Sequence, residues 1–159
     1  MTRAAIDQLL YLMDEAFKDH PFHSLLANLR SVREDDWHWL PPDGVRSIFH
    51  LVEHVGGAKY AFENHAFGDR SLPWGTPGRS TIAREAKPDA IVDWLCEGQR
   101  RLRESVSALE DDGELMRPRR APWGLDGETR WLINMMIQHD LYHSGEINHI
   151  RALRQRNDE

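Results

Sequence analysis

Residues 128–155 read ETRWLINMMIQHDLYHSGEINHIRALRQ, a stretch of 28 residues without proline. Its apolar residues recur at the spacing of an amphipathic helix that buries one face. They are Leu132, Ile133, Met136, Ile137, Leu141, Ile147, Ile150 and Leu153. Asp126 lies just before the stretch and is a candidate helix cap. The segment therefore predicts one long helix packed against other helices.

Three further segments carry the same helical spacing of apolar residues. They run from about Thr2 to Phe17, from about Val45 to Phe67 and from about Pro88 to Leu109, and the first begins at a candidate threonine cap. The segment from Asp111 to Gly127 is predicted to be a long loop, and no segment alternates as a strand would. These patterns predict an all-α four-helix bundle with long loops, built as one domain over residues 1–159.

Composition excludes several classes of protein. The net charge of −6 and the pI near 5.8 argue against a general nucleic-acid binder. Cys96 is the single cysteine, so neither an internal disulfide nor a thiolate metal cluster is possible. The N-terminal residues lack the apolar core of a signal peptide, and no apolar run is long enough to cross a membrane. We therefore expect a cytoplasmic protein that binds neither nucleic acid nor membrane.

Adjacent glycines stand within the second predicted helix. Gly56 and Gly57 each cost about 1 kcal/mol relative to alanine in a helix. They indicate close approach of another backbone or of a ligand, with tolerated strain as the alternative.

Two pairs of histidines stand four residues apart, where both rings of a pair share one helix face. One pair is His50 and His54, and the other is His139 and His143. With nine histidines in 159 residues, chance alone supplies about half of one such pair. The second pair shares its face with core residues of the last helix, so its rings point inward. Buried imidazoles need hydrogen bonds or coordination, and three neutral imidazoles plus water form a common open metal site. Satisfied polar histidines are the alternative.

The residues around these histidines carry a family resemblance. The segment His139-Asp-Leu-Tyr-His143-Ser-Gly-Glu-Ile resembles the last-helix motif of the DinB/YfiT-like superfamily. The segment Ser47-Ile48-x-x-Leu51-Val52-x-His54-Val55 resembles its second-helix motif. The resemblance covers the whole chain in helix order and length. It implies up-down-down-up connectivity and a divalent metal site whose ligands are His54, His139 and His143.

Two further residues are candidates for catalytic roles. His50 has no fixed counterpart in the family pattern. It lies one turn before His54, and its candidate roles are a fourth ligand, a partner of a ligand or a lining residue. Glu146 follows His143 by three residues on the same face. There it orients a ligand imidazole, accepts a proton, or remains a solvated glutamate.

The resemblance also implies a class of reaction. Relatives with assigned activity are metal-dependent transferases and isomerases that use low-molecular-weight thiols such as bacillithiol or mycothiol. We therefore expect a thiol-dependent S-transferase or isomerase, with hydrolysis next, acting on a small molecule. Zinc or nickel is the first expectation, with iron or manganese as alternatives. A non-catalytic metal- or ligand-binding protein of stress response is the competing hypothesis, followed by a purely structural bundle.

The first predicted helix suggests how two copies of the chain associate. It carries apolar residues on more than one side, including Leu9, Leu10, Tyr11 and Leu12. We expect a homodimer through this helix.

Overall fold

The computed structural model describes residues 2–73 and 86–156, and it is mostly helical. The α-helices are α1 (Ala4–Asp14), α2 (Leu25–Leu29), α3 (Ile48–Ala66), α4 (Pro88–Ser107) and α5 (Thr129–Arg156). Shorter elements are the π-helix η1 (Glu15–Asp19), the 3-10 helices η2 (Glu34–Asp36) and η3 (Asp112–Met116), and the strands β1 (Pro118–Arg120) and β2 (Asp126–Glu128). In the described part of the chain, no helix combines the length and hydropathy that crossing a membrane requires.

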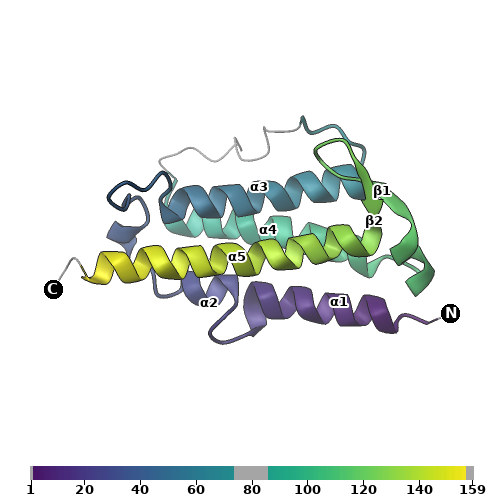
Figure 1. The fold of residues 1–159 in the computed structure, drawn as a ribbon, viewed down its shortest axis with the longest axis horizontal. Helices are drawn as coiled ribbons and strands as arrows, with labels where there is room; N and C mark the ends of the chain where they lie inside the picture. The colour runs from purple at the N-terminus through teal and green to yellow at the C-terminus, as the bar shows by residue number, and fades with distance from the viewer. Residues whose placement is uncertain (1, 74–85, 157–159) are drawn as a thin grey trace.

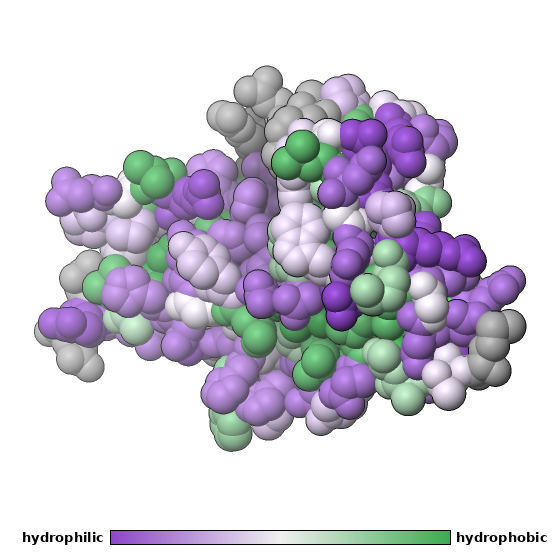
Figure 2. All heavy atoms as spheres, turned by 45° about the vertical axis from the view of Figure 1, so that its right-hand side comes forward, coloured by the Kyte–Doolittle hydropathy of each residue, from purple (hydrophilic) through white to green (hydrophobic). Residues whose placement is uncertain are grey.

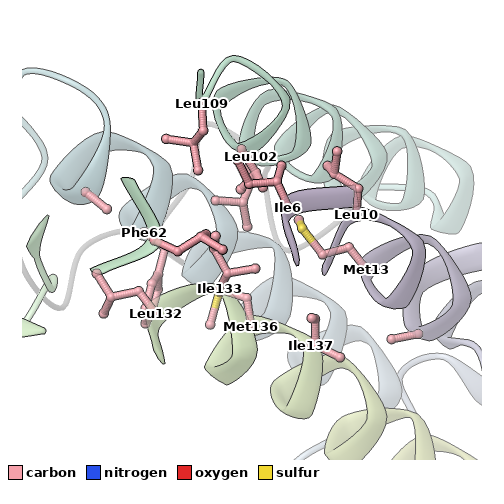
Figure 3. Close-up of a cluster of buried hydrophobic side chains, with 14 of the residues drawn as sticks. Ile6, Leu10, Met13, Phe62, Leu102, Leu109, Leu132, Ile133, Met136 and Ile137 are labelled. Atoms are coloured by element: carbon pink, nitrogen blue, oxygen red, sulfur yellow. The ribbon is translucent and has the colours of Figure 1, made fainter. Parts of the chain in front are cut away.

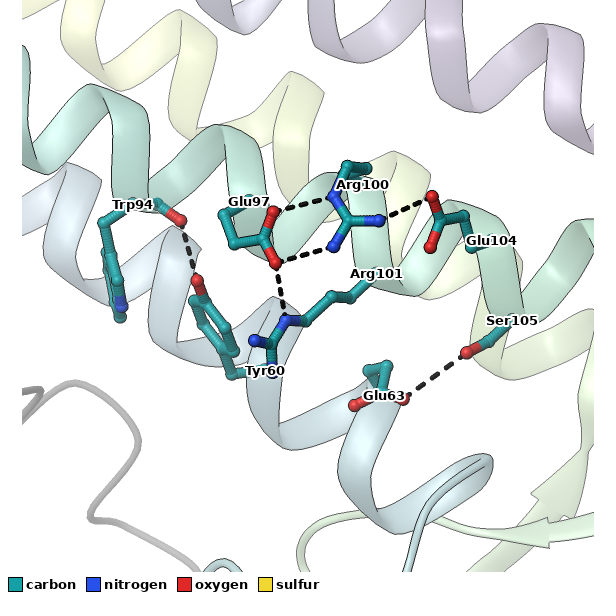
Figure 4. A network of polar contacts seen from close by, with 8 residues as sticks. All are labelled: Tyr60, Glu63, Trp94, Glu97, Arg100, Arg101, Glu104 and Ser105. Carbon is teal, nitrogen blue, oxygen red and sulfur yellow. Dashed lines mark hydrogen bonds and ion pairs between the residues drawn. The ribbon is translucent and has the colours of Figure 1, made fainter.

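The four long helices form a bundle with up-down-down-up connectivity, as predicted. Figure 1 shows α1 and α5 running in one direction and α3 and α4 in the other. The contacts between α3 and α4 follow the same order along both helices, as parallel neighbours require. The Tyr60 hydroxyl donates to the carbonyl of Trp94 at 3.1 Å, and further along Ser105 donates to Glu63 at 3.4 Å (Figure 4).

Two apolar clusters fill the bundle, one toward each end. The first joins α1 to α4 and α5 and is drawn in Figure 3; its members include Ile6, Leu10, Phe62, Leu102, Leu132 and Met136. The second includes Phe17, Leu25, Val52, Ile91, Leu95 and Ile147. On the face shown in Figure 2 most side chains are hydrophilic, and hydrophobic ones are visible in a band across it. On α1, Tyr11 is 57% exposed and Leu12 39%. The homodimer through this helix stays a prediction.

The structure corrects the predicted start of the first helix. The helix begins at Ala4, and Thr2 does not cap it. Instead the carboxylate of Asp112 accepts hydrogen bonds from the backbone amides of Ala5 at 3.3 Å and Ile6 at 3.0 Å. Thr2 donates its hydroxyl to the same carboxylate at 3.0 Å. The cap thus comes from a distant residue, and a local sequence pattern cannot reveal it.

A short β-hairpin stands where the sequence predicted only loop. Strands β1 and β2 pair antiparallel, with Arg119 opposite Gly127 and Arg120 opposite Asp126. The expected absence of strands is therefore wrong here, because strands of three residues are too short to show alternation. Asp126 does not cap the last helix. It lies in β2, where its carboxylate is 2.9 Å from the guanidinium of Arg120.

The Gly56–Gly57 pair lies in a buried part of α3. A Cβ atom at Gly56 would stand 2.3 Å from a ring carbon of Trp94 on α4. Gly56 therefore does mark a close approach, but an aromatic side chain makes it, and not the backbone or ligand that the sequence indicated. The Trp94 ring also stacks on Tyr60 with ring centroids 5.1 Å apart, which fixes α4 closely against α3.

Candidate metal centre

Three histidines converge between α3 and α5. His54 comes from α3, and His139 and His143 come from successive turns of α5. One ring nitrogen from each lies within 4.8 Å of the others. The Nε2 atoms of His54 and His139 are 3.1 Å apart. The structure thus brings together the three residues that the resemblance implied as ligands.

The three rings run from the surface into the bundle. His54 is exposed, His139 is half-buried and His143 is 4% exposed. The α3 residue that follows His54, Val55, is fully buried, so the histidine stands at the edge of the buried face of α3. A ligand therefore reaches the group from the His54 side.

Glu146 holds the most buried ring in place. Its Oε2 lies 2.9 Å from Nδ1 of His143, one turn earlier on α5. Because a carboxylate accepts, Nδ1 carries a proton, so the lone pair of the neutral ring is on Nε2. Metal-binding histidines commonly have such a partner, which fixes the tautomer and the ring orientation. The structure therefore places Glu146 where an orienting role requires it.

Partial desolvation keeps the other two rings, those of His139 and His54, neutral, although His54 is the most exposed of the three. The pKa of His139 falls to about 3 because the ring is desolvated and lies beside His143 and His54. The pKa of His54 is also lowered, first by burial and then by the neighbouring His143 and Arg46. Neutral imidazole is the form that binds metals. Both rings therefore offer lone pairs at neutral pH.

The geometry and chemistry of the group fit a divalent ion. Two nitrogens that each lie about 2.0–2.1 Å from one zinc ion are no more than about 4.2 Å apart. The His54–His139 pair, at 3.1 Å, satisfies this limit, and the three nitrogens together, within 4.8 Å, would close slightly around an ion. Nδ1 of His139 is buried and has no hydrogen-bond partner. An unsatisfied buried nitrogen is costly, and coordination at Nε2 would not supply its missing partner, so the fit to an ion rests on the convergence of the three rings. Three imidazoles suit zinc, nickel, copper or iron.

His50 is not part of this group. Its Nδ1 accepts from the backbone amide of Ser47 at 3.3 Å, while the Ser47 hydroxyl caps α3. The two residues form a capping box that sets where α3 begins, and one ring nitrogen of His50 is used in it. A proton-transfer role for the other nitrogen stays a prediction.

Several residues that lie next to the three histidines were not predicted from the sequence. The exposed ring of Tyr142 packs edge-on against His143, with ring centroids 5.0 Å apart. Lys59 and Asp140 form a buried ion pair; Asp140 directly follows His139, and Lys59 lies five residues after His54. The pair left a signal: each charge interrupts the apolar spacing of its helix, Lys59 between Val55 and Phe62 and Asp140 after Ile137.

Comparisons with known proteins agree with the fold. The family model described as the DinB superfamily matches residues 16–147. A DinB-like protein of Bacillus subtilis, YjoA, superposes with a TM-score of 0.63 at 13% identity, covering 94% of this chain and 92% of its own. A candidate DinB family member of Exiguobacterium sibiricum gives a TM-score of 0.63 at 16% identity, covering 96% and 90%. No curated protein gives a significant match.

Proposed function

The chain belongs to the DinB superfamily, and from that premise we propose that it is a divalent-metal-dependent enzyme using a low-molecular-weight thiol as S-transferase or isomerase. The observation that carries the proposal is the group of His54, His139 and His143, open to solvent on one side. The thiol class comes from the resemblance of the histidine motifs to those of the superfamily.

The absence of negative charge on the three imidazoles favours an anionic ligand at the open position of a bound metal ion. Three neutral imidazoles leave the full double charge of a divalent ion uncompensated, and the only carboxylate in hydrogen-bond contact with the three rings, among the described residues, is Glu146. A divalent ion held in this way lowers the pKa of a thiol or a water molecule at its open position. Thiolate and hydroxide are the ligands that such a site favours.

Residues of the chain itself would orient the histidine rings, admit the substrate and transfer protons. Glu146 holds the proton on Nδ1 of His143 and so directs Nε2 toward the centre of the group. His54 stands at the exposed edge, where a substrate approaches. We propose that His50, one turn before His54, and Glu146 handle protons during the reaction.

The reacting sulfur would arrive with the substrate. Cys96 is half-buried and packs against the second apolar cluster. Burial raises the pKa of its thiol, and the nearby Asp93 raises it further. A thiol in these surroundings is a poor nucleophile.

Turnover by metal-loaded protein tests the proposal. Untagged protein loaded with Zn²⁺ or Ni²⁺ is assayed for conjugation of bacillithiol, mycothiol, glutathione or cysteine to a chromogenic electrophile such as 1-chloro-2,4-dinitrobenzene. We expect metal-dependent conjugation with at least one thiol and its loss in His54→Ala. The exposed α5 residue His149 provides the matched control, since His149→Ala leaves the group intact. Metal binding without turnover would instead support the binding protein, and thiol-independent cleavage of an ester would assign hydrolysis.

A further inference from the structure

A buried polar hub connects the helices at the middle of the bundle. Nζ of Lys59 on α3 lies 2.7 Å from both carboxylate oxygens of Asp140 on α5 and 2.7 Å from Oε1 of Gln99 on α4. All three side chains are buried. The same ammonium group lies 5.0 Å from the ring centroid of Phe17, in the π-helical turn that continues α1. The ammonium group of Lys59, on α3, thus contacts residues of α4, α5 and η1, so that it links all four helices of the bundle.

The hub separates the two apolar clusters. On α3 the second cluster ends at Val55 and the first resumes at Phe62, with Lys59 between them. On α5 the first cluster ends at Ile137 and the second begins at Ile147, with Asp140 between them. Apolar packing tolerates small sliding of one helix along another, whereas hydrogen bonds of 2.7 Å do not.

The hub lies at the level of the three histidines. Asp140 directly follows His139, and Lys59 stands five residues, or about 7.5 Å of helix rise, after His54. The ion pair therefore joins the two helices that carry the histidines, close to the point where Nε2 of His54 meets Nε2 of His139 at 3.1 Å. A displacement of α3 along α5 by about half a helical turn, roughly 2.7 Å, would carry both contacts beyond hydrogen-bond distance.

We propose that the Lys59–Asp140 pair, together with Gln99, is a positioning element that sets the axial register of α3 against α5 and so holds His54 opposite His139. The tests of this role that measure metal binding rest on the proposed function. Net stability is a weak explanation for the pair, because replacing a buried ion pair with apolar side chains of similar volume is often neutral or stabilising. The need for a fixed register between two ligand-bearing helices explains why the charges are buried here despite the cost.

Substitution of the hub by apolar side chains tests this role. The triple variant Lys59→Met, Gln99→Leu, Asp140→Leu removes every polar group of the hub and leaves none unpaired. We expect it to unfold near the wild-type temperature, to bind Co²⁺ at least tenfold more weakly and to give an altered Co²⁺ d–d absorption spectrum. The matched control is the double variant Asp14→Leu, Arg103→Met, which removes the 2.8 Å ion pair between α1 and α4, away from the ligands. It should keep the wild-type affinity and spectrum.

A conservative variant covers the case in which the triple variant does not fold. Asp140→Glu keeps the charge pair and moves the carboxylate by one methylene group. If the pair only neutralises a buried charge, Asp140→Glu binds Co²⁺ like the wild type; if the pair sets the register, the affinity falls and the spectrum changes. Wild-type affinity and spectrum in every hub variant that folds would overturn the proposal.

Failure of the proposed metal function is a separate outcome. If the wild-type protein binds no Co²⁺, crystal structures of metal-free wild type and of a folded hub variant decide the register directly. The proposal holds if the Nε2 atoms of His54 and His139 separate beyond hydrogen-bond distance in the variant. It fails if they remain at the wild-type separation of 3.1 Å.

Discussion

Nε2 of His54 on α3 lies 3.1 Å from Nε2 of His139 on α5, although 85 residues separate them in the sequence. At this distance the two nitrogens cannot both carry a proton, because the two N–H groups would point at each other. Protonation of both rings would also place two positive charges in contact. The pKa of each ring is lowered, first by burial and then by the neighbouring His143. One nitrogen therefore donates to the other in the metal-free protein, and an ion that took the place of this shared proton would face a lone pair from each ring.

The first prediction concerns metal content. Protein purified without an affinity tag should bind one divalent ion per chain, measured by inductively coupled plasma mass spectrometry after dialysis. His139→Ala removes one of the three nitrogens and should lower the affinity by at least about a hundredfold, whereas His149→Ala should not change it. With the ion at 100 times its Kd, the wild type should gain about 2.7 kcal/mol of stability. A chain that binds no ion, with stability unchanged by His139→Ala, would reject the metal site.

Glu146 provides the second prediction. Glu146→Ala removes the acceptor 2.9 Å from Nδ1 of His143 and frees the ring to rotate or change tautomer. The affinity for Zn²⁺, measured by competition with a chromogenic chelator, should fall by about 10–100-fold. Glu110→Ala, at an exposed position outside the group, is the charge-matched control. Equal affinities in the two variants would mean that Glu146 is only a solvated glutamate.

The parts of the fold that were predictable depend on residues close together in sequence. Helix α4 begins at Pro88 as predicted, and α3 and α5 begin within a few residues of the predicted positions. Long apolar stripes define all three, helped by the Ser47 cap of α3 and by Pro88 at the start of α4. The Asp112 cap of α1 and the pairing of Lys59 with Asp140 join residues 106 and 81 positions apart, so no local pattern contains them.

In the candidate site, too, only the arrangement of residues close together in sequence was predictable from spacing. Spacing placed His139 and His143 on one face, and the structure agrees. His54 came from the family motif, since its partner on α5 is 85 residues away. The spacing of four that paired His50 with His54 did not bring His50 into the group, because its ring is used to cap α3 at Ser47. The same spacing of four therefore placed two histidines in the candidate site on α5, whereas on α3 it placed one in the site and the other in a helix cap.

The third prediction compares two glycines that both lie within helices. Gly56→Ala places a Cβ atom 2.3 Å from the Trp94 ring, so α4 must move away from α3. We expect a loss of about 1–3 kcal/mol in the free energy of unfolding, measured with urea. Gly145→Ala meets no atom within 4 Å and should stabilise the protein by about 0.5–1 kcal/mol through helix propensity. If Gly56→Ala is also stabilising, the Trp94 contact is not tight.

The last prediction concerns acid stability of the metal-free protein. His139 has a folded-state pKa of about 3 against an ordinary value of 6.5. As the pH falls below 6.5, the unfolded chain binds a proton that the folded chain does not, so the stability from this group is complete above pH 6.5 and is lost toward pH 3. One such group gives a slope of up to about 1.4 kcal/mol per pH unit. Urea unfolding of wild type and His139→Gln, both in chelator, should therefore give curves that converge as the pH falls. Ionisable groups remote from His139 cancel in the difference, which then reports His139 together with its neighbours His54 and His143. The curve for His149→Gln should run parallel to that of the wild type. Parallel curves for His139→Gln and wild type would show that His139 already takes up its proton near the ordinary pKa, and that burial does not hold its lone pair free for a metal.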